Sequence, residues 1–302
     1  MSNIFTTDKK KKAVLISIYA TAAVIVCLLA TLLITQITKP DDIPEGGGQT
    51  PGAVTEYTDI TVTANQAASG TLVIVNAEHQ WLIEDDPTMV NIKETYPNIP
   101  CDFANYLTCK ADATAAKYFN NMMTALYAAK PDVKIYVNTA YRSFADQSGS
   151  TPAGQSEYHT GLSFKLNHDA STAINATSCA WLYEHAHEYG FIARYPADKS
   201  DVTGVAGYGV DSIFRYVGVV HATYMYENNL CLEEYIDRLL KNHTFETPLV
   251  LKDANCEIYY ATANEFSQIK VPTRYAYTIS GDNAGGYIVT VNKSQRVTAT
   301  AQ

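Results

Sequence analysis

The 302 residues carry a formal charge of −9, and 47% of them are hydrophobic, enough to bury a sizeable core. Such a length suits one main domain with appendages. The first 12 residues hold four lysines and one aspartate, so the rest of the chain has a net charge of −12 and is not expected to bind nucleic acid.

The first apolar segment, residues 13–38, contains no charged side chain. It is long enough to cross a bilayer as a helix, and too long for the apolar part of a cleavable signal peptide. Four lysines precede it directly, so the positive-inside rule predicts a cytoplasmic tail at 1–12 and an extracytoplasmic chain after the span. The sequence therefore predicts a single-pass signal anchor in the cell membrane. Prolines and glycines at 39–58 predict a linker.

The middle of the chain alternates between helical and extended patterns. Apolar residues recur at helical spacing between 112 and 130, which predicts a helix that faces the core. The other elements predicted here are a buried strand at 71–75, a strand at 134–139, a helix at 181–189 closed by Gly190, and an amphipathic helix at 232–241.

From about residue 247 the pattern becomes β-rich. Strands are predicted around 258–260, 275–279 and 287–291, and a glycine-rich turn joins the last two as a hairpin. The predicted C-terminal appendage, residues 247–302, is too small to fold well alone, so we expect it to pack on the main domain.

Six cysteines are present, and Cys27 lies in the predicted span. The other five fit no metal-binding spacing, and their odd number prevents complete pairing. Cys101 and Cys109 are the only close pair, and an oxidising exterior favours a disulfide between them. Buried free thiols are the alternative.

Three motifs stand out in the predicted main domain. Residues 156–165 read SEYHTGLSFK, residues 214–218 read FRYVG, and residues 141–143 read YRS. These motifs resemble those of zinc D-alanyl-D-alanine carboxypeptidases of the VanY type, whose pattern is S-x-H-x-x-G-x-A-x-D, then E-x-W-H, then R-Y-V-G. The resemblance spans roughly residues 70–240. It implies an α+β, D-alanyl-D-alanine carboxypeptidase-like fold for residues 59–246, between the transmembrane helix and the β appendage.

The residues that carry this family's chemistry are replaced. Alignment places Tyr158, Lys165 and Ile213 at the three zinc-ligand positions and Val210 at the catalytic glutamate. A protonated phenol is a poor ligand, an ammonium has no lone pair, and aliphatic side chains have no donor atom. The sequence therefore predicts neither catalytic residues nor a bound zinc, although zinc is the family's cofactor.

Two residues of the family's substrate site are retained. The resemblance implies that Arg142 and Ser156 contact the substrate's backbone and terminal carboxylate. Lys165 adds a second cation, so Arg142 and Lys165 are predicted to form a two-cation seat for a peptide C-terminus. The alternatives are that Arg142 pairs with a carboxylate in its own loop, and that Lys165 faces solvent or pairs with Asp169 or Glu157.

The predicted function is therefore that of a membrane-anchored extracytoplasmic pseudoenzyme. It would bind cell-wall stem peptides or their precursors, or act as a regulatory partner, without hydrolysis; no protein partner is indicated. One alternative is an active metallo-D,D-carboxypeptidase with ligands relocated to His159, Asp169 and His221. The other is a structural interaction domain whose groove is closed by Tyr158 and Ile213.

Overall fold

The computed structural model describes residues 56–84, 88–105, 109–149 and 151–297, which belong to one compact unit of the chain. The predicted tail, the predicted span and nearly all of the predicted linker lie outside these residues. Within the described part of the chain, no helix is long and apolar enough to span a membrane.

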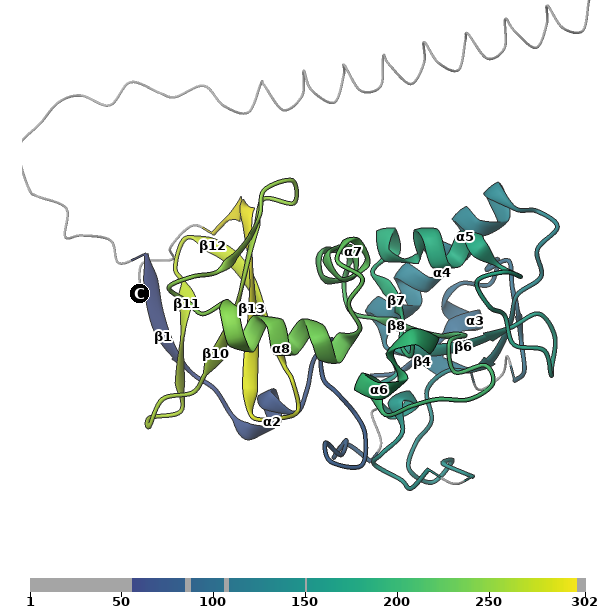
Figure 1. Cartoon of the computed structure of the whole chain (residues 1–302), viewed down its shortest axis with the longest axis horizontal. Helices are drawn as coiled ribbons and strands as arrows, with labels where there is room; N and C mark the ends of the chain where they lie inside the picture. The colour runs from purple at the N-terminus through teal and green to yellow at the C-terminus, as the bar shows by residue number, and fades with distance from the viewer. Residues whose placement is uncertain (1–55, 85–87, 106–108, 150, 298–302) are drawn as a thin grey trace, which may run out of the picture. The chain divides into compact units, whose positions relative to one another are not determined.

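A five-stranded sheet forms the centre of the main domain (Figure 1). The two strands at one edge run parallel, and all other neighbouring strands run antiparallel. In spatial order the strands are β3 (Asp102–Phe103), β5 (Tyr136–Thr139), β6 (Ser163–Asn167), β8 (Ile213–Tyr216) and β7 (Phe191–Ala193). Strand β5 lies within the strand predicted at 134–139. Smaller elements of this region are β2 (Val90–Asn91), α3 (Ile92–Thr95), β4 (Lys110–Ala111), the 3₁₀ turns η1 (Glu157–Thr160) and η3 (Ala197–Lys199), α6 (Ser200–Thr203) and α7 (Val219–Glu227).

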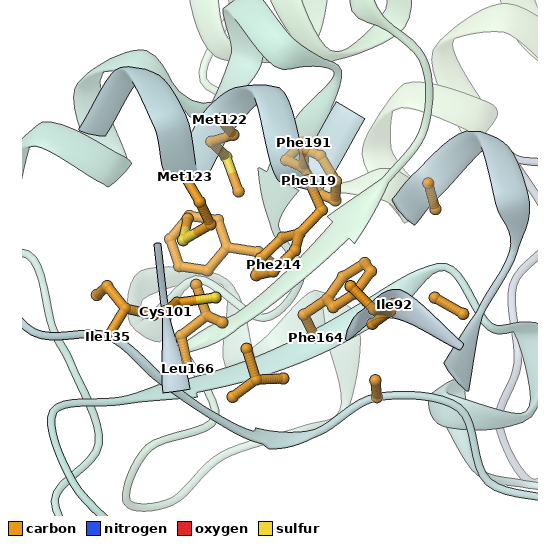
Figure 2. Packing of buried hydrophobic residues seen from close by; sticks show 14 of the residues in the cluster. Ile92, Cys101, Phe119, Met122, Met123, Ile135, Phe164, Leu166, Phe191 and Phe214 are labelled. Carbon is orange, nitrogen blue, oxygen red and sulfur yellow. The ribbon is translucent and has the colours of Figure 1, made fainter. Parts of the chain in front are cut away.

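The helix predicted at 112–130 is confirmed as α4 (Ala113–Ala129). Asp112 caps it, because its carboxylate accepts hydrogen bonds from the backbone N–H groups of Thr114 and Ala115. The buried side of α4 packs against the sheet, and Figure 2 shows this core from close by. The Phe119 ring stacks on Phe164 of β6, with ring centroids 4.2 Å apart.

The helix predicted at 181–189 is split in the structure. Helix α5 (Ala180–His185) passes into the 3₁₀ turn η2 (Ala186–Tyr189), and Gly190 closes it in the left-handed conformation, with φ = 83°. His187 of η2 is partly buried, because its ring stacks on Tyr226 with centroids 3.9 Å apart.

For residues 71–75 the predicted burial is confirmed, but the predicted strand conformation is wrong. Leu72, Val73 and Val75 are buried, but residues 71–75 form no strand. The Leu72 N–H donates to the Ser280 hydroxyl, and the carbonyls of residues 71 and 73 accept hydrogen bonds from the Arg215 guanidinium. Because these backbone groups are satisfied from several directions, no strand ladder forms here.

The predicted C-terminal hairpin is confirmed. Strands β12 (Tyr275–Gly281) and β13 (Gly286–Arg296) pair antiparallel, and β10 (Cys256–Thr262) and β9 (Leu249–Leu251) complete a four-stranded sheet. The amphipathic helix predicted at 232–241 is confirmed as α8 (Leu232–Asn242), which packs its apolar side against β10.

The start of the described chain pairs with the C-terminal region. Strand β1 (Tyr57–Thr61) runs antiparallel to β11 (Gln268–Pro272), and the short helix α2 (Ala64–Ala67) lies against β12 and β13 (Figure 1). Residues 57–67, which span the predicted boundary between linker and main domain, therefore pack with the C-terminal strands.

All five described cysteines are free thiols, so the disulfide between Cys101 and Cys109 is absent. Cys101 is buried, and Cys109 is partly buried. Burial raises the pKa of the Cys109 thiol to about 12 and that of Cys101 still further. Both thiols are therefore protonated at neutral pH.

His221 of α7 should make the stability of the domain sensitive to acid. Its Nδ1 bonds the Tyr235 hydroxyl and its Nε2 bonds the Thr290 hydroxyl. Burial lowers its pKa from 6.5 to about 4. Between these two values the unfolded state takes up a proton that the folded state excludes. The free energy of unfolding should therefore fall by about 3 kcal/mol as pH drops through this window.

Urea denaturation at pH 7 and pH 4.5 measures this dependence. The difference between the two pH values should be smaller in His221→Asn, which does not titrate. An equal difference in both proteins would show that His221 does not carry the effect.

Candidate functional site

Two of the positions predicted to replace the zinc centre are neighbours in the central sheet. Lys165 of β6 is the direct antiparallel neighbour of Ile213 of β8. Lys165 shares its side of the sheet with Ser163, because alternate residues of a strand face the same way, whereas Phe164 and Leu166 face the core. Val210 lies in the turn before β8, where its carbonyl accepts the Ile213 N–H at 3.3 Å.

A cavity of about 690 Å³ opens beside these strands. Ser156, Tyr158 and Ile213 line it, together with side chains from the loops at 75–78, 151–155 and 201–205. Tyr158 and Ile213 form part of this wall and leave the cavity open between them and the surrounding loops.

Two residues of the cavity wall carry a hydroxyl group that makes no side-chain hydrogen bond within the described chain. Ser156 is 6% exposed and Tyr195 is 8% exposed, and both line the cavity. The Ser156 hydroxyl makes no capping bond to η1, which it precedes. The Tyr195 ring packs under the Arg194 guanidinium, with 4.6 Å between Cζ and the ring centroid. Neither oxygen is fully buried, so water or a ligand can bond these hydroxyls.

A network of four buried or partly buried charges adjoins the cavity, and three of them belong to its wall. Glu157 pairs with Arg215 and, at 3.2 Å, with Arg194. Arg194 donates two further hydrogen bonds, of 3.0 and 2.7 Å, to the carboxylate of Glu233 on α8. Burial alone would raise the pKa of Glu157, but the charges of Arg215 and Arg194 outweigh it and hold that pKa below its usual value.

Sequence reasoning missed this network as a unit. Glu157 and Arg215 belong to recognised motifs, but no pattern in the sequence links them to Arg194 or Glu233. The only signal in the sequence is that Glu157 directly follows Ser156 within the motif at 156–165.

Arg142 and Lys165 are not among the residues that line the cavity. The Arg142 guanidinium lies over the Tyr158 ring, with 5.2 Å from Cζ to the ring centroid, and donates to the Thr139 hydroxyl at 3.1 Å. Lys165 Nζ lies beside Gly209, 3.9 Å from where a Cβ on that glycine would be.

Neither cation has an ion-pair partner within the described chain. Glu157 is paired with the two buried arginines, and the Asp169 carboxylate accepts bonds from Ser171 and Thr172. The two ion pairs considered for Lys165, with Glu157 and with Asp169, are therefore absent, as is the loop ion pair considered for Arg142.

The structure does not form the relocated metal site. The Gly154 N–H donates to His159 Nε2, so Nδ1 carries the ring proton and donates to the Arg142 carbonyl at 2.7 Å. Both ring nitrogens of His221 are also engaged, and Asp169 is exposed and held in its own turn. No group of three His, Cys, Asp or Glu side chains within the described ranges is placed to hold a metal ion.

The aligned positions do not suit zinc either. Burial raises the pKa of Tyr158 above its usual value, with Arg142 offsetting part of the effect, so the phenol stays protonated at neutral pH. Lys165 and Ile213 supply no lone pair. Zinc requires three or four nitrogen, sulfur or carboxylate donors, so this donor set does not fit the metal.

Comparison with solved structures defines the class of fold. The chain is similar to the D,D-dipeptidase VanXYg in complex with a D-Ala-D-Ala phosphinate analog, with a TM-score of 0.65 and 24% identity. The match covers 78% of this chain and 98% of that one. The described domain is therefore a mixed α/β domain with the fold of the VanX and VanY D,D-peptidases.

Sequence comparison identifies the family. The family model of the VanY D-alanyl-D-alanine carboxypeptidases matches residues 147–219. A D-alanyl-D-alanine carboxypeptidase of Enterococcus faecium is 32% identical over 268 residues, covering 83% of this chain and 84% of the relative. A second one, from Enterococcus faecalis, is 36% identical over 109 residues, covering 36% of this chain and 40% of the relative. This chain belongs to the VanY family of D-alanyl-D-alanine carboxypeptidases, as its motifs predicted.

Proposed function

We propose that this chain is a pseudoenzyme of the VanY family that binds cell-wall stem peptides, or their precursors, without hydrolysing them. The observation that carries the proposal is an open cavity whose wall holds Tyr158 and Ile213 at positions where the family places zinc ligands. Its relationship to D-alanyl-D-alanine carboxypeptidases supports the class of ligand. The same site is compatible with a regulatory role for the peptide-bound protein.

The absence of hydrolysis follows from the chemistry of the replaced residues. Hydrolysis in this class needs a metal-activated water and a general base beside it. Lys165 would repel a divalent cation, and Val210 can accept no proton. Ser156 stays in the cavity wall, where its hydroxyl can still bond a peptide.

The proposed location is the outer face of the cell membrane. Residues 13–38 would anchor the chain, and the proline- and glycine-containing segment at 39–58 would give the domain reach from the bilayer. A peptide site held close to the membrane suits a ligand that is a membrane-bound wall precursor.

Titration calorimetry of the detergent-solubilised full chain tests the binding, with a stem pentapeptide that ends in D-Ala-D-Ala. A parallel assay follows release of D-alanine with and without added zinc. We expect binding and no release in either condition. Zinc-dependent release would make the protein an active peptidase, and a lack of binding would favour the structural interaction domain.

The same titration tests Arg142 and Lys165. Since both charges lack an ion-pair partner among described residues, they remain candidates for the peptide's terminal carboxylate. Arg142→Ala and Lys165→Ala should each weaken binding about tenfold, the order expected for losing a charge-assisted hydrogen bond. Amidation of the peptide's C-terminus should have a similar effect. Unchanged affinity in either variant would remove that residue from the binding site.

A further inference from the structure

We propose that residues 204–209, the lid segment, cover Lys165 and must move aside before the carboxylate of a peptide can reach its ammonium group. This inference rests on the proposed function and adds a conformational control to the same site. Lys165 is partly buried and lines neither of the two cavities that flank the lid segment. The seat for the terminal carboxylate needs this ammonium group exposed, so the described conformation is the closed one.

The lid segment forms part of the wall of both cavities. Its first two residues, Gly204 and Val205, line the cavity of about 690 Å³ beside Ser156. Residues 205–209 line a second cavity, of about 280 Å³, which also has Ala173 in its wall. Val205 belongs to both walls, so displacement of the lid segment would connect the two cavities.

Lys165 packs against the last residue of the lid segment. A Cβ on Gly209 would stand 3.9 Å from both Cε and Nζ of Lys165, and 2.8 Å from the Cβ of Ala173. Real Cβ atoms do not approach so closely, so only a glycine lets the segment pack against these two side chains. In the sheet, Lys165 is paired with Ile213, which lines the cavity beside Ser156. Moving Gly209 away would therefore free the lysine side chain next to that cavity.

The lid segment is held at its two ends and is free between them. The buried Thr203 hydroxyl accepts the Val205 N–H at 3.3 Å, and the buried Ser212 hydroxyl donates to the Gly209 carbonyl at 2.8 Å. Residues 206–208 are exposed, and within the described chain no hydrogen bond joins them to another segment. A segment with so few contacts can open locally at a small cost in free energy.

Gly207 offers a way to shift this equilibrium. Its φ is 127°, a backbone conformation that L-residues rarely adopt, yet a Cβ there would meet no atom within 4 Å. Alanine at this position would therefore strain the closed conformation without a clash, and opening would relieve the strain. Gly285, in the turn between β12 and β13, is the matched control. It is exposed, its φ is 99°, and a Cβ there would also meet no atom within 4 Å.

Acetylation of Lys165 by an amine-reactive reagent, followed by mass spectrometry, measures opening without any peptide ligand. In the detergent-solubilised full chain, Gly207→Ala should raise the rate at Lys165 about fivefold, since more of the protein is open. Ser212→Ala removes one anchor of the lid segment and should also raise the rate. Gly285→Ala should leave the rate at Lys165 unchanged.

Calorimetry with a stem pentapeptide that ends in D-Ala-D-Ala tests whether the lid segment controls binding. Gly207→Ala should bind this peptide about fivefold more tightly, because the apparent affinity rises with the open fraction. The same substitution should change nothing in the Lys165→Ala background. Amidation of the peptide's C-terminus should also abolish the gain, because the carboxylate that Lys165 would hold is then missing.

The outcomes separate the lid from the proposed function. Unchanged acetylation of Lys165 in both Gly207→Ala and Ser212→Ala, or an equal rise in Gly285→Ala, would overturn the lid. A gain in affinity that persists without Lys165 would overturn it too, since the segment would then act on another contact. Faster acetylation with no binding of the peptide by any variant, or with release of D-alanine, would overturn the proposed function and leave the lid standing.

Discussion

Replacing Glu157 with alanine should lower the free energy of unfolding by about 3–5 kcal/mol, the cost of removing one partner from a buried ion pair. The Glu157 carboxylate is 4% exposed and faces Arg194 and Arg215, whose side chains are 1% and 0% exposed. Without it, Arg194 keeps the Glu233 carboxylate, whereas Arg215 keeps only backbone carbonyls as partners. Urea denaturation of the purified protein at neutral pH measures the loss.

A matched exposed pair provides the control. Asp237 bonds Lys241 at 2.8 Å, but both side chains are more than half exposed, so Asp237→Asn should shift the urea midpoint little. Glu157→Gln keeps the side-chain volume and removes only the charge, so it should also be strongly destabilised. A loss below about 1 kcal/mol in both Glu157 variants would show that the network adds little net stability.

The same carboxylate should contribute to acid sensitivity at pH values below about 4.5. The folded-state pKa of Glu157 lies below its usual value of 4.5. Its contribution to stability is therefore present above that value and is lost as pH falls through the folded-state pKa. Glu157→Gln should lose this part of the pH dependence.

Restoring the family's donors should create a zinc site. The variant combines Tyr158→His, Lys165→Asp, Ile213→His and Val210→Glu. Lys165 and Ile213 are already direct neighbours across β6 and β8, and Tyr158 and Ile213 line one cavity. Zinc at about a thousand times its Kd should then stabilise the folded state by about 4 kcal/mol. That corresponds to a rise in Tm of about 10 °C for a domain of this size.

The unsubstituted chain should show no change in Tm with zinc or with a chelator, because its donor set does not fit the metal. A triple variant with the same substitutions except Lys165→Asp tests the effect of the charge at position 165. An ammonium at that position should repel the metal and abolish the rise in Tm with zinc. Stabilisation of the unsubstituted chain by zinc, or no response in the quadruple variant, would contradict the assignment of these four positions.

The sequence alone determined the elements whose cause is local. The Asp112 cap and the apolar spacing after it define α4, and the turn at 281–285 with its flanking β-branched and aromatic residues defines the hairpin of β12 and β13. The order of the separated motifs predicted the family and therefore the fold. The alignment of these motifs gives Lys165 and Ile213 as two of the replaced positions, and the structure pairs these residues across β6 and β8.

Tertiary structure decided the properties that depend on partners distant in the chain. Residues 71–75 have the composition of a strand. Their backbone groups instead form hydrogen bonds with the side chains of Arg215 and Ser280, which lie more than 140 residues away in the chain. From its charge alone, Glu157 would be expected at the surface. The fold buries it and pairs it with Arg194 and Arg215. The engagement of the His159 and His221 rings and the open cavity likewise depend on contacts that folding creates. Local composition specifies backbone preference and burial, whereas pairing and charge balance are set by which side chains the fold brings within a few ångströms.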